Sequence, residues 1–404
     1  MSKFNEDSRV KIPALLHLTR LGYCFLPKAS MKVIHSQTNI FFDQFKEGLC
    51  KINKKSYGDS QIDTFLSKLA TKLDNEDLGK TFFECLQGDF DCKLIDFENF
   101  DNNIFHVVTE LTYKNGEEEF RPDLTVLING LPLAFIEVKK PNNLDGILAE
   151  RDRINVRFKN PAFKRFMNIT QLLIFSNNLE YDDENADPVQ GAFYASPDSA
   201  FVKFNRFREE DNALIGSVPV ENPETEKLIL KDTNLVSCLG TPEYETNKRQ
   251  STPTNRILTS LLSRPRFRML LRYGIAYVRA PDEFGVMGTE KHIMRYPQLF
   301  AICAIEKKLA EGGKKGVIWH TQGSGKTALA YYSVRYLTDF FRKRRVVAKF
   351  FFIVDRLDLA QQAGDELRLV DSGSRRSDPG KISSRTYEPW SGTQEIGASR
   401  PSPW

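Results

Sequence analysis

Two short segments of the sequence carry two acids and a lysine at a spacing that suits phosphodiester chemistry. The segments RPDLTVLI and LAFIEVKKP contain Asp123, Glu137 and Lys139. Asp123 stands at the start of one apolar run that predicts a strand and Glu137 near the end of the next, and the Asn-Gly pair between the runs predicts a hairpin turn. Residues two apart on a strand share a face, so Glu137 and Lys139 point the same way. The hairpin can place Asp123 at the same rim, which brings two carboxylates and one ammonium together.

Oxygen ligands of this kind suit Mg²⁺, which keeps several waters and leaves room for a phosphate oxygen. We expect Asp123, Glu137 and the carbonyl of Val138 to be metal ligands, and Lys139 to position or activate the attacking water. Lys140 points the other way and is predicted to contact the DNA backbone or solvent. This is the chemistry of the PD-(D/E)xK nucleases.

The bare D-x(n)-E-x-K pattern is weak evidence, because charged residues at strand ends are common and are often merely solvated. The apolar run next to each acid, the proline before Asp123, and a helix and strand predicted to follow favour a nuclease site. Many such sites have a further acid upstream. The sequence offers Glu84 and Glu110 as candidates.

A second motif, HTQGSGKT at 320–327, has the composition of a phosphate-binding loop. It lies between an apolar segment, 316–320, that predicts a strand and a segment that predicts a helix, which is the context such a loop requires. The glycines allow backbone amides to point at phosphate, and the helix N-terminus adds its dipole. The residues predicted to bind ATP are Thr321, Gly323, Ser324, Gly325, Lys326 and Thr327, with the Thr327 hydroxyl also a ligand of Mg²⁺.

Two residues outside the loop complete the motor prediction. Gln298 stands where superfamily 2 motors often place a glutamine that reads adenine, although a surface glutamine is an equal alternative. The segment 348–355 predicts a strand that ends before Arg356, which either touches the DNA backbone or is a solvated charge. No D-E-x-[HD] motif follows an apolar strand, so we expect this chain to bind ATP without hydrolysing it efficiently.

Composition is that of a globular protein of more than one domain. The 404 residues are 41% hydrophobic and 27% charged, with a net charge of +4 that neither requires nor excludes nucleic acid. No run reaches the ~18 apolar residues of a membrane span, and no export signal is present, so a cytoplasmic location is expected. The six cysteines lack the spacing of a zinc site.

The pattern of apolar residues predicts an α/β protein in two parts. Helical spacing up to about residue 100 predicts a helical entry region, followed by a strand meander, a helix and a returning strand at 171–177. Helical spacing returns in PTNRILTSLLSRPRFRMLLRYGIAYV and YPQLFAICAIEKKLAEGGKKG, at 253–278 and 296–316. The predicted divisions are an endonuclease domain at 1–215, a linker or insertion at 216–262, an incomplete first motor domain at 263–370, and an irregular tail at 371–404.

The order of these motifs resembles the restriction (R) subunit of type I restriction-modification enzymes. RPDLTVLINGLPLAFIEVKKP, NITQLLIFSNN, GVIWHTQGSGKT and FFIVDRLDLAQQ are similar to that family's nuclease core, returning strand, motif I and motif Ia. The resemblance implies a PD-(D/E)xK restriction-endonuclease-like domain followed by a partial RecA-like P-loop domain, with the chain truncated after motif Ia. It also implies Mg²⁺ and ATP as cofactors, double-stranded DNA as substrate, and methylation and specificity subunits as partners.

The chain departs from the family at the helix after E-x-K. The family often has a Q-x-x-x-Y motif there, whereas Arg151 and Asn155 occupy a candidate position in this sequence. Two other functions stay open: an ATP- and DNA-binding module without hydrolysis, and a general superfamily 2 helicase with a degenerate nuclease domain. Metal-dependent nicking belongs only to the nuclease interpretation, and the helicase interpretation predicts that Asp123→Ala has no effect.

Overall fold

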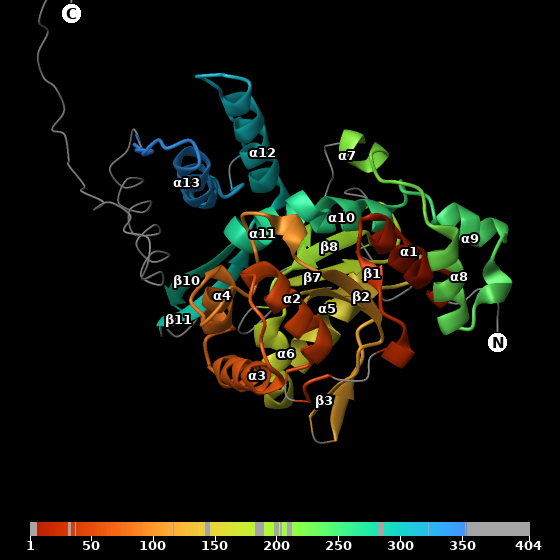
Figure 1. The fold of residues 1–404 in the computed structure, drawn as a ribbon. Helices are drawn as coiled ribbons and strands as arrows, with labels where there is room; N and C mark the ends of the chain where they lie inside the picture. The colour runs from red at the N-terminus through yellow and green to blue at the C-terminus, as the bar shows by residue number, and fades with distance from the viewer. Residues whose placement is uncertain are drawn as a thin grey trace, which may run out of the picture.

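A seven-stranded mixed sheet forms the centre of the computed structural model (Figure 1). The structure describes residues 6–30, 34–36, 38–115, 117–141, 146–181, 190–197, 202, 204–207, 212–281, 287–321, 323–351 and 353. The strand order is β1-β2-β5-β6-β7-β8-β9. Their bounds are β1 Cys24–Phe25, β2 Phe105–Thr109, β5 Leu124–Ile128, β6 Leu131–Val138, β7 Leu172–Ser176, β8 Ala192–Ala195 and β9 Asn205–Arg206.

The predicted hairpin is confirmed and lies in the middle of this sheet. β5 and β6 pair antiparallel, and Asn129 and Gly130 between them have φ angles of 49° and 76°, which suit the tight turn that Asn-Gly favours. A Cβ at Gly130 would lie 2.6 Å from the backbone nitrogen of Phe45, so a larger residue does not fit. Every residue of β6 is buried. The strand that leads to the predicted site is therefore rigidly supported.

The returning strand is also confirmed, because β7 lies parallel to β6. A parallel pair needs a crossover connection, which consists here of α5 Gly146–Lys159, η4 Pro161–Phe163 and α6 Lys164–Ile169. A small separate hairpin, β3 Tyr113–Asn115 and β4 Glu118–Phe120, stacks its aromatic rings against Phe163 and Phe166.

The predicted helical entry region is confirmed as well. Its elements are η1 Asp7–Lys11, α1 Ile12–Arg20, η2 Lys28–Ser30, α2 Phe42–Asn53, α3 Asp59–Leu73, α4 Lys80–Gln87 and η3 Phe100–Asn102. The buried side chains of α1 to α4 join the main hydrophobic core with those of β5 and β6.

The segment at 216–262, predicted to be a linker or insertion, is helical and packed. It contains α8 Pro223–Asp232, η5 Val236–Cys238, α9 Pro242–Asn247 and α10 Pro253–Leu262, after a short α7 Asn212–Gly216. Three of these helices begin with proline, which suits the first helical position. The prolines of this segment are thus helix starts, and its acids include Glu226, which is buried and paired with Lys248. Buried Ile229, Leu230 and Tyr244 belong to the same core as α1.

The rest of the described chain contains α11 Arg264–Tyr273, the hairpin β10 Ile275–Pro281 and β11 Met287–Ile293, α12 Tyr296–Ala310 and α13 Lys326–Arg342. The helices were predicted, but the segment IAYV, expected to continue a helix, is strand β10. α12 and α13 lie at the opposite end of the molecule from α8 and α9 (Figure 1).

The strands predicted at 316–320 and 348–355 are absent from the described residues, so that prediction is wrong there. Val317, Trp319, Phe351 and Ile353 are largely exposed. Their alternation is typical of a strand, yet a strand depends on neighbouring strands for its hydrogen bonds. No described segment pairs with them. A RecA-like sheet is consequently not formed by the described part of the chain, although the helices that would flank it are.

His17 on α1 generates a test of the packing between α1 and α10. Its Nε2 lies 2.7 Å from Thr259 Oγ1, and complete burial lowers the pKa of the imidazole to about 3. The neutral ring is favoured in the fold, so this contribution to stability is complete above about pH 6.5 and is lost as the pH falls towards 3. In the wild type, protonation of His17 should lower the free energy of unfolding by up to about 1.4 kcal/mol for each pH unit over that range. We expect His17→Gln to lack this part of the pH dependence, measured by urea unfolding at a series of pH values. A wild-type slope in the variant would contradict the assignment.

Candidate active site

The three predicted catalytic residues lie together where β6 ends and β5 begins. Asp123 directly precedes β5, and its Oδ2 accepts a hydrogen bond from the Val138 N–H at 2.9 Å. Glu137 is the penultimate residue of β6, and its Oε1 lies 2.7 Å from the Nζ of Lys139. Sequence spacing therefore located the same rim as the structure does. Val138, predicted to offer its carbonyl to a metal, uses its N–H to hold Asp123.

Burial governs the charges at this rim. Burial first, and then the nearby Glu137 carboxylate, raise the pKa of Asp123 to about 7. The pKa of Glu137 is also raised, first by burial. Burial opposes the charged form of Lys139 too, but the Glu137 and Asp123 carboxylates outweigh it and raise the pKa of the ammonium. Lys139 is consequently a cation at neutral pH, suited to positioning a nucleophile and stabilising negative charge.

One oxygen of the site has an unsatisfied bonding capacity that a cation would use. Glu137 is 9% exposed, and its buried Oε2 has no hydrogen-bond partner among the described residues. A buried carboxylate oxygen left without a partner is costly, and a bound cation removes that cost. The described residues contain no group of three or more His, Cys, Asp or Glu side chains that could hold a metal. Asp123 and Glu137 thus form a two-carboxylate set, which fits an ion that keeps waters in its shell.

Two further carboxylates border the site and were missed by the sequence interpretation. Glu6 Oε1 lies 3.5 Å from Lys139 Nζ, and Glu6 Oε2 accepts a hydrogen bond from the Lys140 N–H at 3.4 Å. Glu150, on α5, is 2% exposed and raises the pKa of Glu137. Its spacing from the buried Ile147 and Ile154 is a signal that could have found it. Glu6 is too distant along the sequence to carry any comparable signal.

Neither candidate for an upstream acid lies free in the site. The Glu110 oxygens pair with Lys11 at 2.8 Å and Lys28 at 2.7 Å, and these bonds lower its pKa to about 2. Glu110 does touch the site through its backbone, since its N–H donates to the Asp123 carbonyl at 3.1 Å. Glu84 lies on α4, which packs against α3 and α6.

Arg151 and Asn155, at the candidate position of the Q-x-x-x-Y motif, make contacts within the protein. Asn155 is buried, and its Oδ1 accepts a hydrogen bond from the Val202 N–H at 2.7 Å, so it ties α5 to a neighbouring segment. Arg151 pairs with the carboxylate of Asp152. Lys140, predicted to contact DNA, has an exposed side chain at the edge of the site.

The predicted phosphate loop precedes a helix as expected. Gly323 and Gly325 have φ angles of 75° and 78°, and α13 begins at Lys326. The Lys326 ammonium donates to the carbonyl of Thr321 at 3.0 Å. Of the remaining predicted nucleotide ligands, Ser324 has a buried hydroxyl without a hydrogen-bond partner among the described residues, and Thr327 is half-buried on the first turn of α13.

Gln298 contacts this loop directly, so its alternative as a surface residue is wrong. It is 2% exposed, its Oε1 accepts from the Arg295 N–H at 2.8 Å, and its Nε2 donates to the Gly325 carbonyl at 3.1 Å. A Cβ at position 325 would lie 2.6 Å from that Nε2. The first turn of α12 thereby holds the loop. Arg356, like the predicted tail at 371–404, lies outside the described residues.

Comparison with known protein families gives the class of the two parts. Residues 3–182 match the family "Type I restriction enzyme R protein N terminus", and residues 291–398 match the family "Type III restriction enzyme, res subunit". The first match contains the Asp123–Glu137–Lys139 rim and the second contains the phosphate loop. The second match also extends past residue 370, where the sequence resemblance was expected to end. Together, the matches indicate a nuclease-like region of a restriction enzyme followed by a helicase-like region.

Curated proteins that align with most of the chain are named endonuclease subunits of type I restriction enzymes. The chain is 28% identical over 67% of its length to an endonuclease subunit assigned to the type I restriction enzyme MjaVIIP of Methanocaldococcus jannaschii. It is 24% identical over 79% of its length to the type I restriction enzyme SauCOLORF180P endonuclease subunit of Staphylococcus aureus, and 25% identical over 80% to the HindI endonuclease subunit of Haemophilus influenzae. These relatives are what the chain is similar to: endonuclease subunits of type I restriction enzymes.

The chain spans only part of the relatives that it matches. It covers 21% of the MjaVIIP protein, 29% of the S. aureus protein and 28% of the HindI protein. In the described part of the chain, every helix is too short or too polar to cross a membrane.

Asp123→Asn tests the cost of burying charge at the site. Because the pKa of Asp123 is raised from 3.8 to about 7 in the fold, its ionisation destabilises the metal-free protein progressively as the pH rises from 4 to 7. Asparagine keeps an oxygen for the Val138 N–H, so we expect the variant to be more stable at pH 8 by about 1–3 kcal/mol. Thermal unfolding in EDTA measures the difference. Asp91→Asn, at an exposed ion pair with Lys68, is the matched control and should change stability by no more than about 0.5 kcal/mol.

Proposed function

We propose that this chain is the nuclease-bearing part of a type I restriction subunit and cleaves double-stranded DNA in a Mg²⁺-dependent reaction. The observation that carries the proposal is the convergence of Asp123, Glu137 and Lys139 at one buried rim. The names of the relatives, all endonuclease subunits of type I restriction enzymes, support the same activity.

The residues divide the work of cleavage according to their charge. Asp123 and Glu137 would hold Mg²⁺, which would polarise the scissile phosphate and make a water molecule more acidic. Glu137 uses Oε2 for this purpose, because Oε1 already pairs with Lys139. Lys139 orients the water nucleophile and stabilises the negative charge that develops on the phosphate. Lys140 steadies the DNA through a backbone phosphate.

The loop at 320–327 is proposed to bind ATP for DNA translocation. Backbone amides around Gly323 and Gly325 and the N-terminus of α13 would receive the phosphates, with Lys326 moving from the Thr321 carbonyl to the β and γ phosphates. Gln298 holds the loop through the Gly325 carbonyl and is proposed to contact the adenine base. Arg356 is proposed as a DNA contact of the motor. Translocation and recognition are shared with methylation and specificity subunits, which we propose as the partners.

The nuclease proposal is tested with Lys139→Ala. We expect at least a hundredfold loss of Mg²⁺-dependent nicking of supercoiled plasmid, because a charge that acts in the transition state contributes several kcal/mol. The assay uses the chain alone and with methylation and specificity subunits. Glu84→Gln, which neutralises a half-buried carboxyl on α4, is the control and should nick normally. Full nicking by Lys139→Ala would refute the catalytic assignment, and nicking by neither protein would favour a binding module.

Lys326→Ala tests the nucleotide loop separately. It removes the point charge for the phosphates, so we expect ATP affinity to fall at least tenfold in a titration with a fluorescent ATP analogue. Lys308→Ala, at an exposed position of α12, changes the same charge away from the loop and should bind normally. Because the loop is separate from the rim, metal-dependent nicking of naked DNA by the chain alone should persist in Lys326→Ala. Unchanged nucleotide affinity would refute the assignment of the loop.

A further inference from the structure

The N-terminal helix (residues 6–20, comprising η1 and α1) touches the ends of both strands that carry the catalytic rim. At its first turn, Glu6 lies 3.5 Å from the Lys139 ammonium and accepts a hydrogen bond from the Lys140 N–H. One turn later, Lys11 pairs with Glu110, whose N–H donates to the Asp123 carbonyl. The helix therefore contacts the segment after β6 and the segment before β5.

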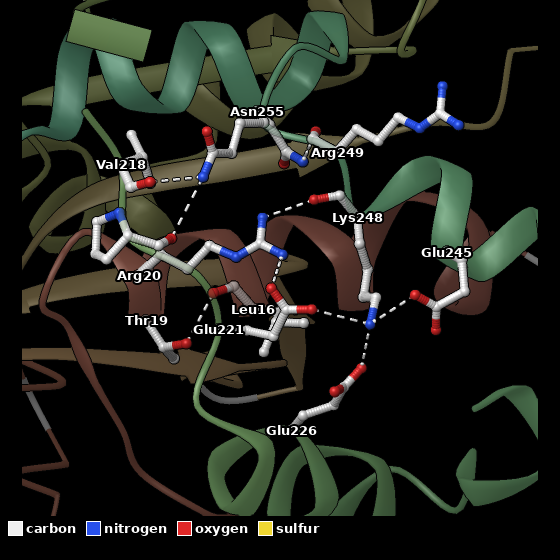
Figure 2. A network of polar contacts seen from close by, with 12 residues as sticks. Leu16, Thr19, Arg20, Val218, Glu221, Glu226, Glu245, Lys248, Arg249 and Asn255 are labelled. Carbon is white, nitrogen blue, oxygen red and sulfur yellow. Dashed lines mark hydrogen bonds and ion pairs between the residues drawn. The ribbon is translucent and has the colours of Figure 1, made fainter. Parts of the chain in front are cut away.

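The other end of the same helix is fixed by buried charges. Arg20 pairs with Glu221 at 2.6 Å and donates to the Lys248 carbonyl at 2.6 Å (Figure 2). The Lys248 ammonium contacts Glu221 at 3.1 Å and both Glu226 and Glu245 at 2.9 Å. Arg20 and Lys248 are less than a tenth exposed. We call these five residues the clamp.

A buried ion pair resists rearrangement, because removing one partner leaves the other charged and desolvated. Between the clamp and Glu6, the side chains of Leu15, Leu16 and Leu18 are fully buried, and His17 is bonded to Thr259. Sliding or turning the N-terminal helix would break all these contacts together. The position of Glu6 therefore depends on the contacts of Arg20 at the other end of the helix as well as on the contacts of Glu6 itself.

Lys139 needs a second restraint of this kind. It lies just beyond the last residue of β6, on a flexible four-carbon stem, and Glu137 holds it from one side only. Glu6 approaches the same ammonium from another element and also holds the adjoining backbone at Lys140. Two carboxylates from different elements define a position for the ammonium, whereas one allows it to swing.

We propose that Glu6 is a positioning residue for Lys139 and that the clamp around Arg20 and Lys248 fixes the helix from which Glu6 acts. This inference rests on the proposed nuclease function, which it deepens. It makes a site at the rim depend on residues of α8 and α9, which pack along the N-terminal helix, α9 against η1 and α8 against α1.

The direct test is Glu6→Gln in the full chain. Competitive labelling with an acetylating reagent, followed by peptide mass spectrometry, measures the accessibility of Lys139 against the exposed Lys140. We expect Lys139 to be labelled at least threefold faster in the variant, and the labelling of the buried Lys248 and Lys291 to be unchanged. Nicking should fall about tenfold, because a small displacement of a reacting group has effects of this order. Asp7→Asn removes the neighbouring carboxylate, which contacts Lys11, and should leave the Lys139 labelling rate as in the wild type.

The clamp is tested with Arg20→Gln and with the milder Glu245→Gln, which removes the most exposed carboxylate from Lys248. Both should raise Lys139 labelling, Glu245→Gln less than Arg20→Gln. Faster labelling of Lys248 with Lys139 unchanged would show that the clamp does not determine the rim, and unchanged Lys139 labelling in Glu6→Gln would overturn the inference. Labelling does not depend on catalysis, so it decides the inference even where the wild-type chain fails to nick DNA, a result that would refute only the proposed function.

Discussion

Burial of carboxylates at the end of a central strand is the constraint on which the rest of this structure depends. Asp123 and Glu137 are held in surroundings that disfavour their charge, and Lys139 is the cation that makes this tolerable. Such an arrangement persists only on a support that cannot relax. β6, buried along its whole length between β5 and β7, is that support. Burial of apolar side chains in the large core around this strand offsets the free-energy cost of burying the two carboxylates.

Local sequence was sufficient to find the rim, because each of its parts is a short-range signal. The Asn-Gly turn sets the register of β5 and β6, and the period of two places Glu137 and Lys139 on one face. Glu6 could not be found in this way, since its contact with Lys139 results from helix packing between distant segments. Gln298 is an intermediate case. Its position was recognised, but only the fold reveals that its amide bonds to Gly325.

The errors of the sequence interpretation also have physical causes. Alternating apolar residues such as Val317 and Trp319 predict a strand, yet pairing is a property of neighbours, and no described segment provides them. Conversely, the segment at 216–262 was predicted to be a linker or insertion, and its helices α8 and α9 were not predicted, although proline at a first helical position favours a helix. Helices α12 and α13 follow from their own periodicity and were predicted, which is why the helical part of the motor region was anticipated better than its sheet.

The packing of α8 and α10 against α1 changes how the chain can be divided experimentally. A fragment that ends at residue 215 contains every residue of the rim, and by sequence it would be a natural choice. It would nevertheless strip α1 of the covering supplied by Ile229 and Leu258 and leave Arg20 buried without Glu221. The smallest fragment that contains the rim and keeps this packing therefore extends at least to Leu262. An expression boundary should accordingly be placed after α10 and not before the segment predicted to be a linker or insertion.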